Sequence, residues 1–147
     1  MKRTSAALAA AALLALASTG LASASARTEK LTAHKTKLGS ILVNGRGFTV
    51  YAFTKDSRNH DSCVEIRECA HIWPPVTSGG RASAGAGLKS SLIGSITIKG
   101  GAKQVTYAGH PLYTYSGDSG PAETGYVDFS AFGGRWPAVN TSGGEVK

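Results

Sequence analysis

The sequence lacks most of the patterns on which common enzyme and nucleic-acid-binding classes depend. It has no G-x-S-x-G segment, no phosphate-binding loop and no H-E-x-x-H pattern, which excludes the hydrolases, nucleotide-binding proteins and zinc proteases that use them. Its 16 lysines and arginines include no run of five or more, so there is no basic stripe for nucleic acid. We therefore expect a protein that is not an enzyme, takes no cofactor and binds no nucleic acid.

A long hydrophobic segment is also lacking, and the one apolar run lies at the N-terminus. Two basic residues precede an alanine- and leucine-rich run over residues 6–17, and Ala24–Ala26 matches the small-residue signature of signal-peptide cleavage. The run is too short and too rich in alanine to span a membrane. The sequence predicts a signal peptide over residues 1–26, cleaved after Ala26, and a secreted product with no membrane span.

Cysteine is scarce as well, with Cys63 and Cys69 as the only two. Both lie far beyond the apolar run, so no cysteine directly follows it for lipid attachment near a mature N-terminus. A close pair in an exported chain favours a disulfide, which stabilises a fold by about 2–2.5 kcal/mol when it closes a short loop. The alternative is a metal site with the flanking His60 and His71, but export disfavours free thiolates and Cys2His2 sites use tighter spacing. We expect the disulfide.

The mature chain is small and basic. Cleavage would leave 121 residues, enough for one domain with a modest core. It would also leave 14 basic and nine acidic residues, a net charge of about +5. This charge allows weak attraction to an anionic cell-wall polymer or membrane, or is simply the surface of a soluble domain. We expect flexible segments at 27–37 and 141–147 and a single β domain over 38–140.

The second half of the chain repeats the first. Trp73-Pro74 recurs as Trp136-Pro137, and five other residues recur at an offset of 62 positions. These are Val43, Gly47, Tyr51, Asp56 and Ser57, matched by Val105, Gly109, Tyr113, Asp118 and Ser119. A shared order of this length indicates a duplicated unit, with repeat 1 at about 38–77 and repeat 2 at about 92–140.

Turn residues and β-rich runs predict a hairpin in each repeat. In repeat 1, residues 38–54 form two such runs around Asn44-Gly45, a sequence typical of two-residue hairpin turns. In repeat 2, residues 95–107 turn at Gly100-Gly101, and Ala108-Gly109 makes a further turn. The expected fold is all-β with little helix, in which two hairpin-based repeats pack as a pseudo-symmetric sandwich or small barrel.

Three other segments complete the expected fold. Residues 64–71 can form only one or two helical turns, because prolines follow Trp73. The Gly-, Ser- and Ala-rich residues 78–90 indicate a loop. Residues 135–139 are expected to form a short edge strand, since Pro137 cannot donate to a central ladder.

Each repeat carries one short motif, an aromatic pair followed by an aspartate. The motif residues are Tyr51, Phe53 and Asp56 in repeat 1 and Tyr113, Tyr115 and Asp118 in repeat 2. Residues two apart on a strand share a face, so each motif sets two rings side by side with a carboxylate in the turn beyond. A structural role, with the rings in the core, accounts for the whole motif. The alternative is a cleft in which Trp73 and Trp136 stack on a sugar or small planar ligand.

These motifs resemble those of one known family. The similarity rests on the Tyr-x-aromatic-x-x-Asp pairs, on Cys69–Pro75 after Cys63 and on residues 104–113, and it covers about 38–139. The family is the bacterial "secreted repeat of unknown function", also described as predicted lipoproteins with a Yx(F/W/Y)xxD motif. The resemblance implies an exported bacterial protein of two repeats with no established activity. Unlike the lipoprotein members, this chain lacks a lipid-attachment cysteine.

A metal site near the motifs is one further hypothesis. The candidate ligands are His60, His71, His110, Asp56 and Asp118. No histidine pair has the i, i+4 spacing of a helical metal site, and residues 56–61 lack the spacing of an EF-hand loop. We therefore predict no metal.

A serine hydrolase is the remaining hypothesis. Residues 117–120 around Ser119 resemble the nucleophile segment of chymotrypsin-like proteases, and the residues around His34 faintly resemble their histidine segment. Such proteases need two complete barrels, which 121 residues cannot supply, and the duplication itself explains Asp118-Ser119. We expect instead a non-catalytic domain of the cell envelope or surroundings whose role and partner the sequence does not identify; a cell-wall polymer and a small ligand are the candidate partners.

Overall fold

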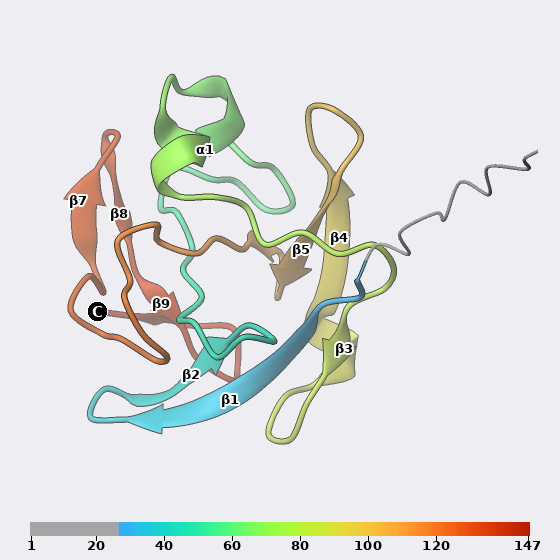
Figure 1. Ribbon diagram of the computed structural model, residues 1–147, viewed down its shortest axis with the longest axis vertical. Coiled ribbons are helices and arrows are strands. Elements are labelled where there is room, and N and C mark those ends of the chain that lie inside the picture. The colour runs from blue at the N-terminus through green and yellow to red at the C-terminus, as the bar shows by residue number, and fades with distance from the viewer. Residues whose placement is uncertain (1–26) are drawn as a thin grey trace, which may run out of the picture.

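The structure is a computed structural model that describes residues 27–147, and this part of the chain consists mainly of short β-strands and turns (Figure 1). The strands are β1 (Lys30–Thr36), β2 (Gly39–Val43), β3 (Ser83–Ala84), β4 (Ile93–Thr97), β5 (Lys103–Tyr107), β6 (His110–Pro111), β7 (Phe129–Ala131), β8 (Gly134–Trp136), β9 (Ala138–Val139) and β10 (Glu145–Val146). Helix is limited to α1 (Cys69–Ile72) and the 3-10 turns η1 (Cys63–Glu65) and η2 (Ser90–Leu92). The expected all-β class is confirmed. The predicted signal peptide and its cleavage after Ala26 lie outside the described residues.

Each repeat is built on one antiparallel hairpin. β1 pairs with β2, and β4 pairs with β5, each over five residue pairs. Figure 1 shows the β1–β2 hairpin along the bottom of the molecule and the β4–β5 hairpin at its right. The second hairpin turns where the sequence predicted, because Gly100 and Gly101 both have positive φ angles. The following turn at Ala108-Gly109 also forms, and it leads into β6.

The N-terminal segment differs from the sequence-based expectation. Residues 27–37 are expected to be flexible, yet β1 occupies most of them and pairs with β2 on one side and with β3 on the other. The side chain of Leu31 is fully buried and anchors the strand to the core. One large apolar residue and one alanine among polar neighbours give too weak a periodic signal to predict a strand from sequence.

The turn after β2 also differs from the prediction. Asn44-Gly45 does not form a two-residue turn; instead Asn44 Oδ1 accepts the backbone N–H groups of Arg46 and Phe48, each at 3.0 Å. The positive φ angle falls on Gly47, at 86°, and its partner in the second repeat, Gly109, has 87°. The duplicated glycine, which has no Cβ to oppose this conformation, therefore sets the turn in both repeats.

The C-terminal end is likewise paired rather than a flexible tail. β10 pairs with β9 in antiparallel fashion, so residues 141–147 turn back along the sheet. The turn is closed by a hydrogen bond from Gly143 N–H to the carbonyl of Asn140. The predicted strand over 135–139 is divided into β8 and β9 at Pro137, which has no N–H to donate.

A pseudo-twofold relation between the repeats centres on Tyr51 and Tyr113. The two residues lie opposite each other, and each donates its backbone N–H to the other's carbonyl, at 2.8 and 2.9 Å. Because the pairing joins equivalent positions of the two repeats, the contact is the same from both sides. The tyrosine segments thus form the junction between the repeats.

The repeats also exchange their Trp-Pro segments across this junction. Ala52 donates its N–H to the carbonyl of Pro137 at 2.9 Å, and Thr114 donates to Pro74 at 3.0 Å. The two bonds occupy equivalent positions, since the donors differ by 62 residues and the acceptors by 63. Each repeat therefore supplies the strand that flanks the tyrosine segment of the other.

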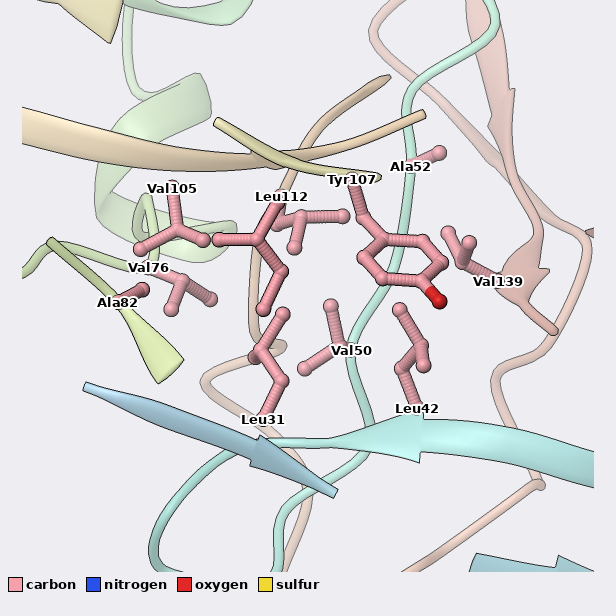
Figure 2. Close-up of a cluster of buried hydrophobic side chains, with 11 residues drawn as sticks. Leu31, Leu42, Val50, Ala52, Val76, Ala82, Val105, Tyr107, Leu112 and Val139 are labelled. Carbon is pink, nitrogen blue, oxygen red and sulfur yellow. The ribbon is translucent and has the colours of Figure 1, made fainter. Parts of the chain in front are cut away.

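An aliphatic core lies between the two hairpins. Figure 2 shows Leu31 and Leu42 pointing from β1 and β2 toward Leu112 and Tyr107 of the second repeat, with Val50 between them. All five side chains are fully buried. Burying one such side chain stabilises a fold by about 1.5–3 kcal/mol. This core holds the two repeats together.

The strands belong to four small sheets, ordered β2-β1-β3, β4-β5-β6, β7-β8 and β10-β9. Isolated bridges outside the named strands, including the one between Tyr51 and Tyr113, add pairing between the repeats. Over residues 27–147 the sheets do not close into a barrel, so the predicted sandwich or barrel is not confirmed. The structure contains two hairpin-based repeats, but the first hairpin is β1–β2 at residues 30–43 and not the predicted one at 38–54.

Candidate functional site

Each motif tyrosine donates its hydroxyl hydrogen bond to the motif aspartate of the other repeat. Tyr113 Oη donates to Asp56 Oδ2 at 2.7 Å, and Tyr51 Oη donates to Asp118 Oδ2 at 3.0 Å. Both tyrosines are fully buried. Because the paired strands carry each ring to the turn of the opposite repeat, the duplicated motif is one reciprocal unit rather than two separate sites.

A second acid accompanies each motif aspartate, and the sequence analysis missed it. Asp61 and Glu123 are 62 residues apart, so the repeat offset could have found them. Asp61 Oδ1 accepts the N–H of Val64 at 2.9 Å, while its buried Oδ2 has no hydrogen-bond partner in the described part of the chain. Glu123 Oε1 accepts the hydroxyl of Ser119 at 2.6 Å. Each tyrosine hydroxyl thus faces two acidic side chains.

Burial shifts the pKa values of this unit. Loss of hydration raises the pKa of Asp56 and of Asp118 from 3.8 to about 6, although the tyrosine hydrogen bonds act in the opposite direction. Burial, together with the neighbouring carboxylates, also raises the pKa of Tyr51 and Tyr113 above the ordinary tyrosine value. The tyrosines therefore remain hydrogen-bond donors at neutral pH, and the aspartates take up protons under mildly acidic conditions.

These shifts predict that mild acid stabilises the protein through the two aspartates. Their pKa values in the folded state exceed the unfolded value, so the stabilising contribution is complete below about pH 4 and is lost as pH rises through about 6. We expect the pair to add about 1–2 kcal/mol to the unfolding free energy at pH 4.5 relative to pH 7.5, after allowance for partial solvent contact. Chemical denaturation across this pH range measures the effect.

The double variant D56N/D118N keeps a hydrogen-bond acceptor for each tyrosine but removes both titrations. It should flatten the pH profile between about pH 4 and 6 and raise stability at pH 7.5. Glu145→Gln, which alters an exposed acid, serves as the matched control and should leave the profile unchanged. A double variant with the wild-type pH slope would contradict the assignment to Asp56 and Asp118.

The remaining motif rings form a stack of four with the two tryptophans. Trp73 and Trp136 lie nearly parallel at 4.1 Å between ring centroids, Phe53 stacks on Trp136 at 4.1 Å, and Tyr115 lies on Trp73 at 4.4 Å. Each tryptophan is therefore covered on its outer face by the aromatic residue of the opposite repeat. This second core, like the aliphatic one, contains side chains from both repeats.

Trp73 and Trp136, the residues suggested to stack on a ligand, lie in the core. Both side chains have an exposed fraction of 0%, so neither presents a face to a sugar or planar ligand. Sequence alone could not distinguish this case, because a ring that stacks on a ligand and a ring that stacks on another ring have the same composition. The cleft hypothesis loses the surface on which it depended.

The predicted disulfide between Cys63 and Cys69 is confirmed. Both cysteines are fully buried and belong to the same cluster as Trp73 and the other stacked rings. The bridge joins η1 to α1 and so holds the connection between the Asp56 turn and the Trp-Pro segment. Its place beside the aromatic core explains why a short loop carries a crosslink.

The histidines named as metal candidates lie in different surroundings. His60 lines a surface groove of about 430 Å³ with Asp61. His110 lines a separate hollow with Asp56 and Arg58, and His71 is exposed on α1. Among residues 27–147, the acidic, histidine and cysteine side chains form no group of three or more that could hold a metal ion.

The residues of the serine-hydrolase hypothesis are engaged in other contacts. Ser119 donates its hydroxyl to Glu123, and Asp118 accepts the hydrogen bond of Tyr51. His34 is an exposed residue of β1 and lies opposite Ile41 in the hairpin. Asp118 therefore contacts the other repeat, whereas Ser119 contacts a residue of its own repeat.

The two signs of charge are distributed unequally over the molecule. Of the 14 lysines and arginines in residues 27–147, all except Arg135 are exposed. Of the nine acidic residues only Glu65, Glu68 and Glu145 are exposed, and Asp61 and Asp118 are buried. The outer surface is consequently more basic than the net charge indicates.

Few of these cations are neutralised by neighbouring acids. The structure has two ion pairs over residues 27–147, Arg67 with Glu68 and Arg135 with Asp128. The first joins two highly exposed side chains, for which pairing contributes little. The other exposed lysines and arginines are therefore open to external anions. This arrangement could not be recognised from composition, because it depends on which acids the fold buries.

These observations define a two-repeat β protein whose motif faces inward and whose surface is basic. A family model described as "secreted repeat of unknown function" matches residues 32–77 and 94–140, and the chain belongs to this family. The suspected family and its two repeats are thereby confirmed. Neither the curated proteins nor the solved structures contain a match. In residues 27–147, no helix is long and apolar enough to cross a membrane.

Proposed function

We propose that this protein is a non-catalytic domain of the cell envelope or extracellular space that associates with anionic envelope polymers through its basic surface. The observation that carries the proposal is the charge distribution. Thirteen of 14 cations face solvent, against three of nine acids. Basic surfaces concentrate anionic partners by long-range attraction, which acts over a screening length of about 8 Å at physiological ionic strength.

The inward orientation of the duplicated motif supports a non-catalytic role. The tyrosine hydroxyls, the motif aspartates and the tryptophans are occupied with one another, so the motif serves folding rather than chemistry. What remains for a partner is the outer surface, where lysine and arginine predominate. A rigid domain with a basic exterior suits attachment to an anionic polymer.

The proposal is tested by cosedimentation of the purified secreted protein with bacterial cell walls. Half of the wall sample is treated with hydrofluoric acid, which removes phosphate-linked polymers. We expect binding to untreated walls at about 50 mM NaCl, release at about 500 mM, and strongly reduced binding to treated walls. Binding that survives both high salt and polymer removal would contradict the proposal, as would absence of binding to untreated walls.

A further inference from the structure

Two adjoining grooves on the molecular surface share one wall. Their volumes are about 550 and 390 Å³, and Gly79 and Lys103 line both of them. Arg27 lines only the first groove and Arg81 only the second, so Lys103 stands at the boundary between them; the two grooves together are called the depression below. The depression runs along the loop before β3 and the neighbouring β4–β5 hairpin, which is at the right of Figure 1.

Within the described residues the three cations of this depression have no acidic partner, although the Lys103 ammonium donates a hydrogen bond to the Thr97 hydroxyl. All are exposed, and in residues 27–147 none of them belongs to an ion pair. The one acid that lines either groove is Glu29, and its Oε1 accepts the backbone N–H groups of Lys30 and Gly45. The carboxylate is thus held by backbone donors, while the cations have no acidic partner.

The walls of the depression suit close approach of a ligand chain. Four glycines line it, where the lack of side chains leaves the backbone accessible, namely Gly79, Gly80, Gly94 and Gly101. Thr77 and Ser95 add hydroxyl groups, one in each groove. The arginine guanidinium group matches the geometry of phosphate oxygens and can bind them in bidentate fashion.

We propose that this depression, with Arg27, Lys103 and Arg81 in sequence along it, is the binding site for a linear phosphate-bearing polymer. The inference rests on the proposed function and specifies its site and the chemistry of its ligand. Three cations spread along an open depression fit successive phosphates of a chain, whereas one small anion would require them to converge. Each cation neutralises one phosphate, so affinity depends on salt through the number of contacts.

The test compares two variants with equal loss of charge. R81Q/K103Q removes two cations from the depression, and K35Q/K37Q removes two exposed cations from the β1–β2 hairpin. The probe is long-chain inorganic polyphosphate, and its affinity is measured by isothermal titration calorimetry at several salt concentrations. All four positions are exposed, so the melting temperatures of both variants should stay close to that of the wild type.

R81Q/K103Q should weaken polyphosphate binding at least about tenfold and reduce the salt slope by about 1.4, the value expected for two lost contacts to a single chain. K35Q/K37Q should change affinity by less than about threefold. Equal losses in the two variants would overturn the site while leaving the proposed function standing. If the wild type binds neither polyphosphate nor cell walls, the proposed function itself is overturned.

The phosphate groups of membrane lipids are an alternative ligand. A parallel measurement distinguishes them from a phosphate-bearing polymer. Vesicles of phosphatidylglycerol and phosphatidylcholine replace polyphosphate as the probe. We expect R81Q/K103Q to weaken polyphosphate binding, and we expect its affinity for vesicles to equal that of the K35Q/K37Q variant. Dependence on Arg81 and Lys103 for vesicles alone would contradict it.

Discussion

Replacing Trp136 by alanine is expected to lower the free energy of unfolding by about 3–5 kcal/mol, the range for large aromatic residues in a well-packed core. Trp136 is fully buried, stacks on Trp73 and on Phe53 at 4.1 Å each, and contacts Tyr113 edge-on at 5.1 Å. Alanine would leave a cavity at the centre of the ring stack, where rings from both repeats meet. A melting-temperature decrease of about 10–20 °C is expected for a chain of this size.

Two comparisons make this prediction specific. Phe129 is an aromatic residue with an exposed fraction of 46%, so Phe129→Ala should change stability by less than about 0.5 kcal/mol. Trp136 Nε1 donates to the carbonyl of Ala131, whereas buried Trp73 Nε1 has no acceptor over residues 27–147. Trp136→Phe should therefore cost more than Trp73→Phe. An unchanged melting temperature in Trp136→Ala would contradict the shared aromatic core.

Separating the two repeats is expected to abolish folding of each. Fragments 27–87 and 88–147 divide the chain in the loop after β3, so both hairpins stay intact. Each fragment nevertheless loses the strand that flanks its tyrosine segment, because Thr54 donates to Arg135 and Ser116 donates to Ile72 across the repeats. The loss equals the whole unfolding free energy, about 5–15 kcal/mol for an ordinary domain.

Circular dichroism and proton NMR measure this outcome. Each fragment alone should give the spectrum of an unfolded chain without a cooperative melt, and an equimolar mixture should recover the spectrum of the intact protein. The matched control is the folded chain cleaved once in the same loop, which should remain associated and folded. Cooperative unfolding of either fragment by itself would show that the repeats are independent units.

The central arrangement explains why the duplicated motif has its form. A tyrosine that crosses to the opposite repeat needs an acceptor there, and the aspartate just beyond each strand supplies one. The second aromatic residue of each motif covers the tryptophan of the other repeat. Each of the three specified residues in Tyr-x-aromatic-x-x-Asp therefore contacts the other repeat.

The repeat offset alone could have extended this account at the sequence level. Applied beyond Ser57, it pairs Asp61 with Glu123, the second acids that face the two tyrosines. It also places Gly47 and Gly109 at equivalent turns, ahead of the more obvious Asn44-Gly45. Local turn statistics favoured the Asn-Gly pair, but the fold uses the duplicated glycine because the chain must reverse just before the tyrosine segment.

The sequence by itself determined the all-β class, the two repeats, the family and the pairing of Cys63 with Cys69, since these depend on local pattern, spacing and composition. Only the tertiary structure decided that the repeats exchange their Trp-Pro segments, that Trp73 and Trp136 face each other rather than a ligand, and that residues 30–36 and 145–146 join sheets. It also decided which charges reach the surface. The exchange and the tryptophan contact join residues between 40 and 85 positions apart, which a local pattern does not record, and burial depends on the whole fold.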